Sequence, residues 1–100
     1  MSKLENRFQA DLIEELQKTF PNSIILKNDA GYKQGIPDLS IFEGSRWATL
    51  ECKKNSKAAH QPNQDYYVGK MNSMSFSRFI SPENREEIIN ELKVFFCRPQ

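Results

Sequence analysis

Residues 38–53 read DLSIFEGSRWATLECK, and this stretch decides the fold. Apolar and polar side chains alternate, or nearly alternate, on both sides of Gly44-Ser45, as in two strands that each bury one face. Glycine at the first central position of a two-residue turn is typical of a type II′ hairpin. The stretch therefore predicts two antiparallel strands, over residues 39–42 and 46–53.

The turn also predicts the register of this hairpin, because residues at equal distances from the turn face each other. The facing residues are compatible: opposite charges, two aromatic rings, two apolar pairs and two hydroxyls. These pairs are Glu43 with Arg46, Phe42 with Trp47, Ile41 with Ala48, Ser40 with Thr49, and Leu39 with Leu50.

The next pair in this register, Asp38 with Glu51, sets two carboxylates opposite each other, where like charges destabilise a sheet. Because strand side chains alternate, Lys53 projects beside Glu51, whereas Cys52 points toward the core. One interpretation is a splayed, hydrated end of the hairpin. The other is a divalent cation between the carboxylates, since Mg²⁺ prefers oxygen ligands, with Lys53 beside an attacking water.

A third carboxylate lies in the first predicted helix, over residues 3–20, which Pro21 ends. Its apolar stripe consists of Leu4, Phe8, Leu12, Ile13, Leu16 and Phe20. Glu5 lies within this stripe. It either closes a capping box with Ser2, reaching back to the Ser2 amide, or serves the same site as Asp38 and Glu51.

The remaining segments predict a strand over 23–26 with Ile24 and Ile25 buried, and a polar loop over 28–35. Pro62 suits the first turn of a helix over 62–71, and alternation over 73–80 predicts another strand. Ser81-Pro82-Glu83 is typical of a helix start, and the helix that follows buries residues Ile88, Ile89, Leu92 and Phe95 or Phe96.

The element order is therefore α-β-β-β-α-β-α, which predicts an α/β fold with a mixed central sheet flanked by helices. One hundred residues correspond to a single domain, 1–100. No segment is typical of a signal peptide or a membrane span. Cys52 and Cys97 are too few for a disulfide scaffold and favour two reduced thiols in the cytoplasm.

Net charge is only +1, so charge alone does not predict nucleic-acid binding. Residues 27–78 nevertheless carry eight Lys/Arg and five Asp/Glu, whereas the rest of the chain carries six and eight. The excess of basic residues over 27–78 could form a surface that faces phosphates, although scattered surface charges explain this count equally well. The candidate phosphate contacts are Lys27, Lys33, Lys54, Lys57, Lys70 and Arg78.

Two short motifs, Gly35-Ile36-Pro37-Asp38 and Leu50-Glu51-Cys52-Lys53, resemble the PD-(D/E)XK nuclease signature. The element order is similar to the restriction-endonuclease-like core. Small size and the Gly-x-Pro-Asp form most resemble the VRR-NUC type of virus-encoded nucleases and similar Holliday-junction resolvases. The resemblance covers nearly the whole chain.

This resemblance implies that Asp38, Glu51 and the Cys52 carbonyl bind Mg²⁺ or Mn²⁺, and that Lys53 serves the water nucleophile. It also places a first-helix glutamate at Glu5. A glutamine that positions water or phosphate falls on Gln64, with Gln61 as a weaker candidate.

The expected activity is metal-dependent hydrolysis of DNA phosphodiester bonds, with branched DNA or a Holliday junction as one candidate substrate. Paired cuts by a chain this short would require a homodimer. If the chain is phage-encoded, the host cytoplasm is the expected location. Two alternatives are an inactive nucleic-acid-binding module and an accessory subunit with a structural metal, which a lysine beside the ligands fits poorly.

Among aromatic residues, Tyr66, Tyr67, Trp47 and Phe76 could stack on bases or pack internally.

Overall fold

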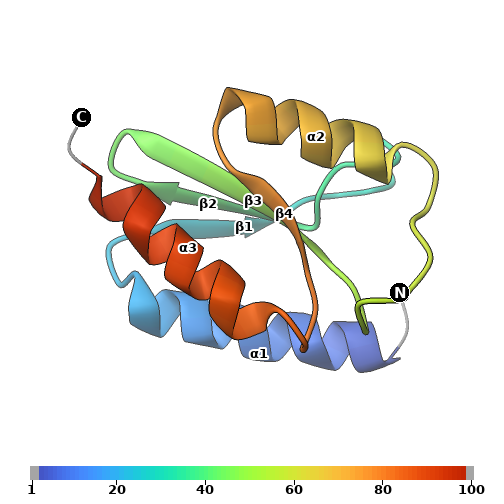
Figure 1. The fold of residues 1–100 in the computed structure, drawn as a ribbon, viewed down its shortest axis with the longest axis horizontal. Helices are drawn as coiled ribbons and strands as arrows, with labels where there is room; N and C mark the ends of the chain where they lie inside the picture. Colours follow the sequence, from blue (N-terminus) through green and yellow to red (C-terminus); the bar gives the residue numbers. More distant parts are fainter. Residues whose placement is uncertain (1–2, 99–100) are drawn as a thin grey trace.

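The computed structural model describes residues 3–98, which form a four-stranded sheet with helices on both faces (Figure 1). Its elements are α1 (Lys3–Thr19), β1 (Ile24–Lys27), β2 (Leu39–Glu43), β3 (Arg46–Cys52), α2 (Gln64–Met74), β4 (Ser77–Ile80) and α3 (Arg85–Cys97). The order predicted from the sequence is confirmed, and so is the α/β fold class with a mixed sheet. Ser2, the residue proposed to cap Glu5, lies outside the described residues.

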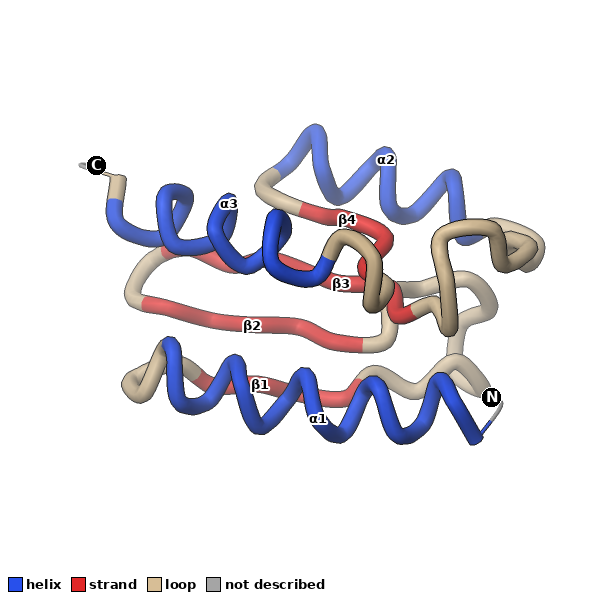
Figure 2. The backbone as a smooth tube through the Cα atoms, turned by 60° about the horizontal axis from the view of Figure 1, so that its bottom comes forward, coloured by secondary structure: helices blue, strands red, loops and turns tan. Residues whose placement is uncertain are grey.

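The four strands lie side by side in chain order, as the tube in Figure 2 shows. β1, β2 and β3 are antiparallel neighbours, whereas β4 runs parallel to β3 after the chain has crossed over through α2. All five residue pairs predicted for the hairpin are present. Gly44 has a φ of 61° and Ser45 has no positive φ, which fits a type II′ turn and excludes type I′.

The hydrophobic core lies between the sheet and the layer formed by α1 and α3, while α2 covers the other face over β3 and β4 (Figures 1 and 2). Core side chains from the helices include Phe8, Leu12, Leu16, Ile88, Ile89 and Leu92. Those from the strands include Leu39, Ile41, Leu50, Cys52 and Ile80. Cys52 therefore points inward, as the alternation predicts.

The prediction of a buried strand over 23–26 is wrong. β1 forms the edge of the sheet, and α2 does not extend over it, so Ile24 and Leu26 are 62% and 49% exposed. Only Ile25 turns toward the core, where it is partly buried. An apolar run alone cannot distinguish a covered strand from an edge strand.

Further boundaries also differ from the prediction: α2 begins at Gln64, so Pro62 precedes the helix instead of occupying its first turn. α2 continues through Ser73 and Met74, and β4 begins only at Ser77, because the Ser75 amide still closes the last helical turn on the Met71 carbonyl. α3 begins at Arg85 rather than near Ser81.

Residues 81–84 instead form a turn in which Asn84 Oδ1 accepts a hydrogen bond from the Ser81 amide at 2.8 Å. Leu4, predicted to belong to the apolar stripe, is 66% exposed because it lies in the first turn of α1, one turn before the core contacts begin at Phe8. The core therefore begins one helical turn later in α1, and α3 starts four residues later, than the sequence patterns predict.

Within residues 3–98, no helix combines the length and apolar character needed to cross a membrane. The two thiols are free, with Cys52 buried and Cys97 exposed.

Candidate functional site

Asp38 and Glu51 meet where the β2–β3 hairpin opens away from its turn. The Asp38 side chain folds back on the neighbouring strand, so that its Oδ2 accepts a hydrogen bond from the Cys52 amide at 2.9 Å. The two carboxyl groups also hydrogen-bond to each other. Glu51 is only 4% exposed, which excludes the splayed, hydrated hairpin end.

Burial controls the charge of this pair. It raises the pKa of Glu51 to about 8, with the nearby Asp38 carboxylate as the second cause. Burial also raises the pKa of Asp38, although the hydrogen bond from the Cys52 amide opposes that rise. Both shifts disfavour the state in which the two carboxyl groups of the metal-free pair are ionised together, because negative charges this close repel each other.

Lys53 and Gln64 join Glu51 in a chain of hydrogen bonds. Lys53 is only 6% exposed, and its ammonium donates to the Ala59 carbonyl at 3.1 Å and to Gln64 Oε1 at 2.6 Å. Gln64 Nε2 in turn donates to Glu51 Oε2 at 2.8 Å. A glutamine suits this place because its amide accepts from a cation on one side and donates to a carboxylate on the other.

Gln64 lies at the start of α2, and Gln61 precedes that helix by three residues. Gln61 contributes its backbone amide, which donates to Gln64 Oε1 at 2.8 Å, and its side chain is exposed. The structure therefore brings Gln64, rather than the side chain of Gln61, to the acid pair.

The site also contacts α1, where Glu5 is half-buried. The charge of Glu5 raises the pKa of Asp38, so the two carboxyl groups lie near each other. Gln9, one helical turn further on, is buried and hydrogen-bonds to the Cys52 thiol. The sequence prediction missed Gln9, although its spacing of four residues from Glu5 puts both on one helix face.

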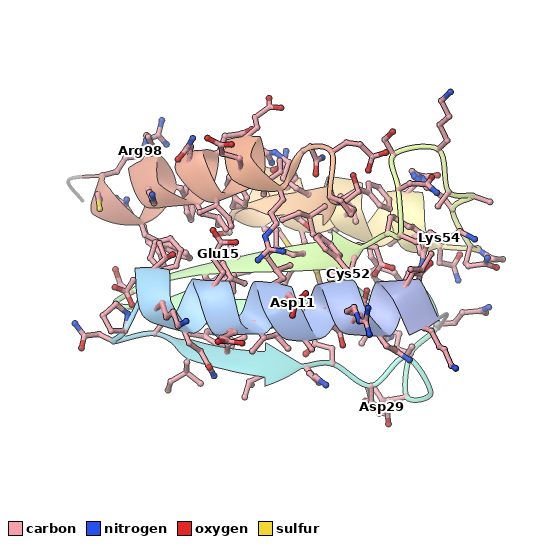
Figure 3. All side chains as sticks on the ribbon, turned by 90° about the horizontal axis from the view of Figure 1, so that it is seen from below. Asp11, Glu15, Asp29, Cys52, Lys54 and Arg98 are labelled. Atoms are coloured by element: carbon pink, nitrogen blue, oxygen red, sulfur yellow. The ribbon has the colours of Figure 1, made fainter. Side chains whose placement is uncertain are left out.

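Cys52 itself offers the site only main-chain atoms. Its thiol is 1% exposed within the apolar core, and burial strongly raises the pKa of that thiol. A protonated, inward-pointing thiol is a poor metal ligand. Figure 3 shows Cys52 at the end of the sheet, behind the N-terminal half of α1, with Lys54 in the segment beyond.

The oxygen atoms at the site fit a hard divalent cation that keeps part of its water shell. Glu51 is buried and Asp38 is partly buried, and burial raises the pKa of both carboxyl groups. Mg²⁺ typically binds through one or two carboxylates plus water and substrate phosphate. Within residues 3–98, no three His, Cys, Asp or Glu side chains are grouped closely enough for an all-protein metal cage.

Five candidate phosphate contacts, Lys27, Lys33, Lys54, Lys57 and Lys70, are exposed. Lys27 pairs with Leu39, so it lies at the end of the sheet that carries Asp38. Lys54 and Lys57 belong to the segment between Lys53 and α2, and Lys33 to the loop that precedes Asp38. A basic surface around the acid pair is therefore available.

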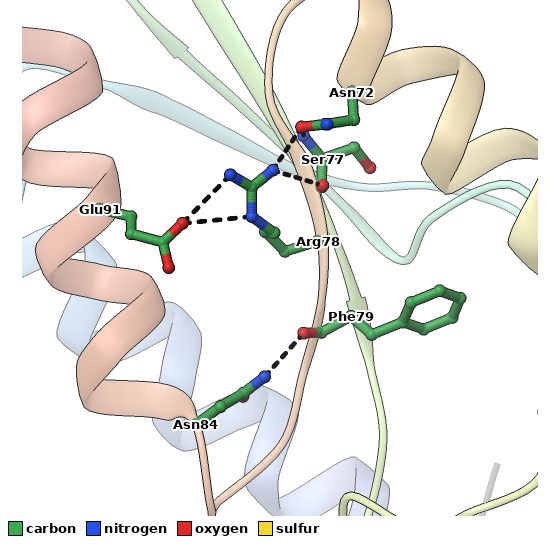
Figure 4. A network of polar contacts seen from close by, with 6 residues as sticks. All are labelled: Asn72, Ser77, Arg78, Phe79, Asn84 and Glu91. Carbon is green, nitrogen blue, oxygen red and sulfur yellow. Dashed lines mark hydrogen bonds and ion pairs between the residues drawn. The ribbon is translucent and has the colours of Figure 1, made fainter.

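Arg78 is already used within the fold, as Figure 4 shows. Its guanidinium pairs with Glu91 at 3.1 Å and hydrogen-bonds to Asn72 and to the Ser77 carbonyl. It also lies over the ring of Phe76, which is buried, so Phe76 is not available to stack on a base. Tyr66 is 62% exposed, and Tyr67 and Trp47 are half-buried.

A groove of about 1000 Å³ lies between the C-terminal part of α2, β4 and α3, away from the acid pair. Four glutamates and two arginines line it, which leaves a net negative charge: Glu83, Glu86, Glu87, Glu91, Arg78 and Arg98. This negative lining would repel a phosphate backbone.

No family model matches the chain, and no curated protein matches it in sequence. One solved structure, described as a "VRR_NUC domain protein", superposes on it with a TM-score of 0.67 over 95% of this chain and 89% of the other, at 13% sequence identity. The chain has a VRR_NUC-like fold. This topology agrees with the restriction-endonuclease-like α/β architecture expected from the sequence.

Proposed function

We propose that this chain is a metal-dependent nuclease that hydrolyses DNA phosphodiester bonds with Mg²⁺ or Mn²⁺. The observation that carries the proposal is the pairing of buried Glu51 with partly buried Asp38, linked through Gln64 to the ammonium of buried Lys53. A fold has little structural use for a buried glutamate beside a second, partly buried acid and a buried lysine, because burying charge costs stability. The VRR_NUC-like fold supports the same conclusion.

In this proposal, Asp38, Glu51 and the Cys52 carbonyl hold the cation, and Glu5 contributes from α1. The cation would neutralise the scissile phosphate and acidify a water at the site. Lys53 would orient the attacking water as an ammonium, or accept its proton as a neutral amine, and Gln64 fixes the Lys53 nitrogen and one oxygen of Glu51. Rigid placement of charged groups provides most of the rate enhancement in such reactions.

The exposed lysines around the site would contact phosphates without reading sequence, so binding should weaken with salt. We include Lys27, Lys33, Lys54, Lys57 and Lys70 in this surface. Arg78 would have to leave Glu91 to join it, so we expect Arg78 to support the fold instead.

We further propose that the active form is a homodimer, because each chain positions one acid pair and paired cuts need two. Ile24, Leu26 and Phe42 are exposed on one face of the sheet. Soluble monomers seldom expose such a patch, and a second copy could cover it.

We place the activity in the cytoplasm, or in the host cytoplasm for a phage-encoded chain, where the two thiols would stay reduced.

The decisive experiment incubates the purified protein with plasmid DNA and with a four-way junction, in Mg²⁺, in Mn²⁺ and in chelator. We expect metal-dependent cutting, and comparison of the two substrates tests the preference for branched DNA. Asp38→Ala and Glu51→Ala should abolish cutting but retain or strengthen DNA binding, because a negative charge facing phosphate has been removed. Normal cutting by either variant would show that the site assignment is wrong, and binding without any cutting by the wild type would favour an inactive binding module.

A further inference from the structure

The segment between β3 and α2, residues 53–63, supplies backbone contacts to the proposed catalytic side chains. The Ala59 carbonyl accepts a hydrogen bond from Lys53 Nζ, and the Gln61 amide donates one to Gln64 Oε1. His60 lies between these two residues. Any displacement of His60 therefore moves a partner of Lys53 and a partner of Gln64 at once.

His60 is fixed by two contacts outside the catalytic chain. Its ring stacks on Phe79, with centroids 4.0 Å apart and an angle of 15° between the planes. Its Nδ1 hydrogen-bonds to Asp65 Oδ1 at 2.7 Å. Phe79 lies on β4 directly opposite Glu51 of β3. The ring against which His60 stacks is therefore carried by the residue paired with Glu51.

The two contacts differ in strength. The Asp65 side chain is 75% exposed, and ion pairs in water contribute little. Stacking against an aromatic ring still stabilises the segment at the surface, because it removes apolar surface from water. The ring of His60, rather than its polar atoms, should therefore hold the segment in place.

We propose that His60 is a positioning residue, whose ring packs against Phe79 and thereby aligns Lys53 and Gln64 on Glu51. This inference rests on the proposed nuclease function only for its kinetic consequence. Its structural part concerns the Gln64 side chain and can be measured in the absence of DNA and metal.

The test compares His60→Ala, which loses both contacts, with His60→Phe, which keeps the stack, and with Asp65→Ala, which removes only the exposed hydrogen bond. In the cutting assay, His60→Ala should lower kcat by about 10- to 100-fold, as is common for residues that orient catalytic groups, with little change in KM. His60→Phe should recover most of the loss, and Asp65→Ala should change kcat by less than about 3-fold.

The second readout is the ¹H–¹⁵N NMR signal of the Gln64 side-chain amide, recorded on metal-free protein. Wild type, His60→Phe and Asp65→Ala should show the signal shifted by its hydrogen bond to Glu51, whereas His60→Ala should show it near the position of a free amide. Wild-type kcat together with an unchanged amide signal in His60→Ala would overturn the proposal. An effect on KM alone would overturn it as well, and would make His60 a DNA contact.

If His60→Phe lowers kcat as much as His60→Ala does, the ring stack on Phe79 is not what holds the segment in place. If the wild type cuts no DNA, the nuclease proposal fails, while the amide signals still decide whether His60 aligns Gln64.

Discussion

Glu51 is the residue on which the rest of the site depends. It is almost completely buried, it faces a second carboxylate, and its hydrogen bond to Gln64 connects it to the only buried lysine of residues 3–98. Of these groups, the sequence predicted Asp38, Glu51 and Lys53 from the hairpin register, because strand alternation places them on one face. It could not predict that Gln9 is buried beside Cys52, since burial of one polar helix residue depends on tertiary packing.

The raised pKa of Glu51 predicts how the stability of the metal-free protein depends on pH. Between the unfolded value of 4.5 and the folded value of about 8, the folded chain holds a proton that the unfolded chain has released. The Glu51 contribution to the free energy of unfolding should therefore fall as pH rises through this range, with a slope of at most about 1.4 kcal/mol per pH unit. Urea titrations at pH 5 and pH 8 in chelator measure this difference.

Glu51→Gln should flatten that dependence, because the amide does not titrate. Glu87→Gln, which changes an exposed carboxylate on α3, is the matched control and should leave it unchanged. Equal slopes for wild type and Glu51→Gln would show that the pH dependence has another origin.

At the scale of elements, the site is assembled where two loops touch. Gly35, in the loop before Asp38, has a φ of 94° and lies against the backbone just before α2. A Cβ on Gly35 would lie 2.6 Å from Asn63 Cβ and 2.9 Å from the Pro62 carbonyl oxygen. Glycine is thus required both by the positive φ and by the close approach that brings Gln64 to the acid pair.

Gly35→Ala should consequently destabilise the fold by about 2 kcal/mol or more, through the strained φ and the clash. Cutting should fall as well, because the Gln64 end of α2 must move. Gly69→Ala is the matched control: nothing lies near the added methyl group, and alanine in a helix interior should stabilise by about 0.5–1 kcal/mol. Chemical denaturation of both variants measures the contrast, and a Gly35→Ala variant as stable as wild type would contradict it.

The elements that the sequence predicted best are those with local signals. The hairpin has its turn and its facing pairs, and α1 has a repeating apolar face. β1 was mistaken for a buried strand because its exposure depends on where α2 ends over the sheet. The start of β4 was placed too early because 73–77 alternates even though its first two residues complete α2. In both cases the missing information concerned non-local contacts.

At the scale of the whole molecule, the two faces of the sheet differ in coverage. α1 and α3 lie on one face, whereas α2 leaves the β1–β2 half of the other face open. Phe42, from the exposed apolar patch, lies near one end of β2, and Asp38, from the acid pair, directly precedes the other end. Two copies joined through the patch would bring two sites into one assembly.

Phe42→Lys should therefore shift the protein from dimer to monomer in sedimentation experiments and convert paired cuts into nicks. Val94→Lys is the matched control, because Val94 is also an exposed apolar residue, 66% exposed on α3 across the sheet. It should leave both properties unchanged. A wild type that is strictly monomeric at working concentration would remove the paired-cut proposal.

The hairpin that carries Asp38 and Glu51 needs only neighbouring residues, whereas the parallel strand β4 joins it from 28 positions downstream, as the pairing of Thr49 with Ser77 shows. Short-range contacts form faster than distant ones. On a ribosome, the two acids would thus first meet in an open, hydrated state, where their mutual repulsion is weak. Only the later arrival of residues 64–80 would enclose them, and amide hydrogen exchange during refolding should accordingly protect β2 and β3 before β4.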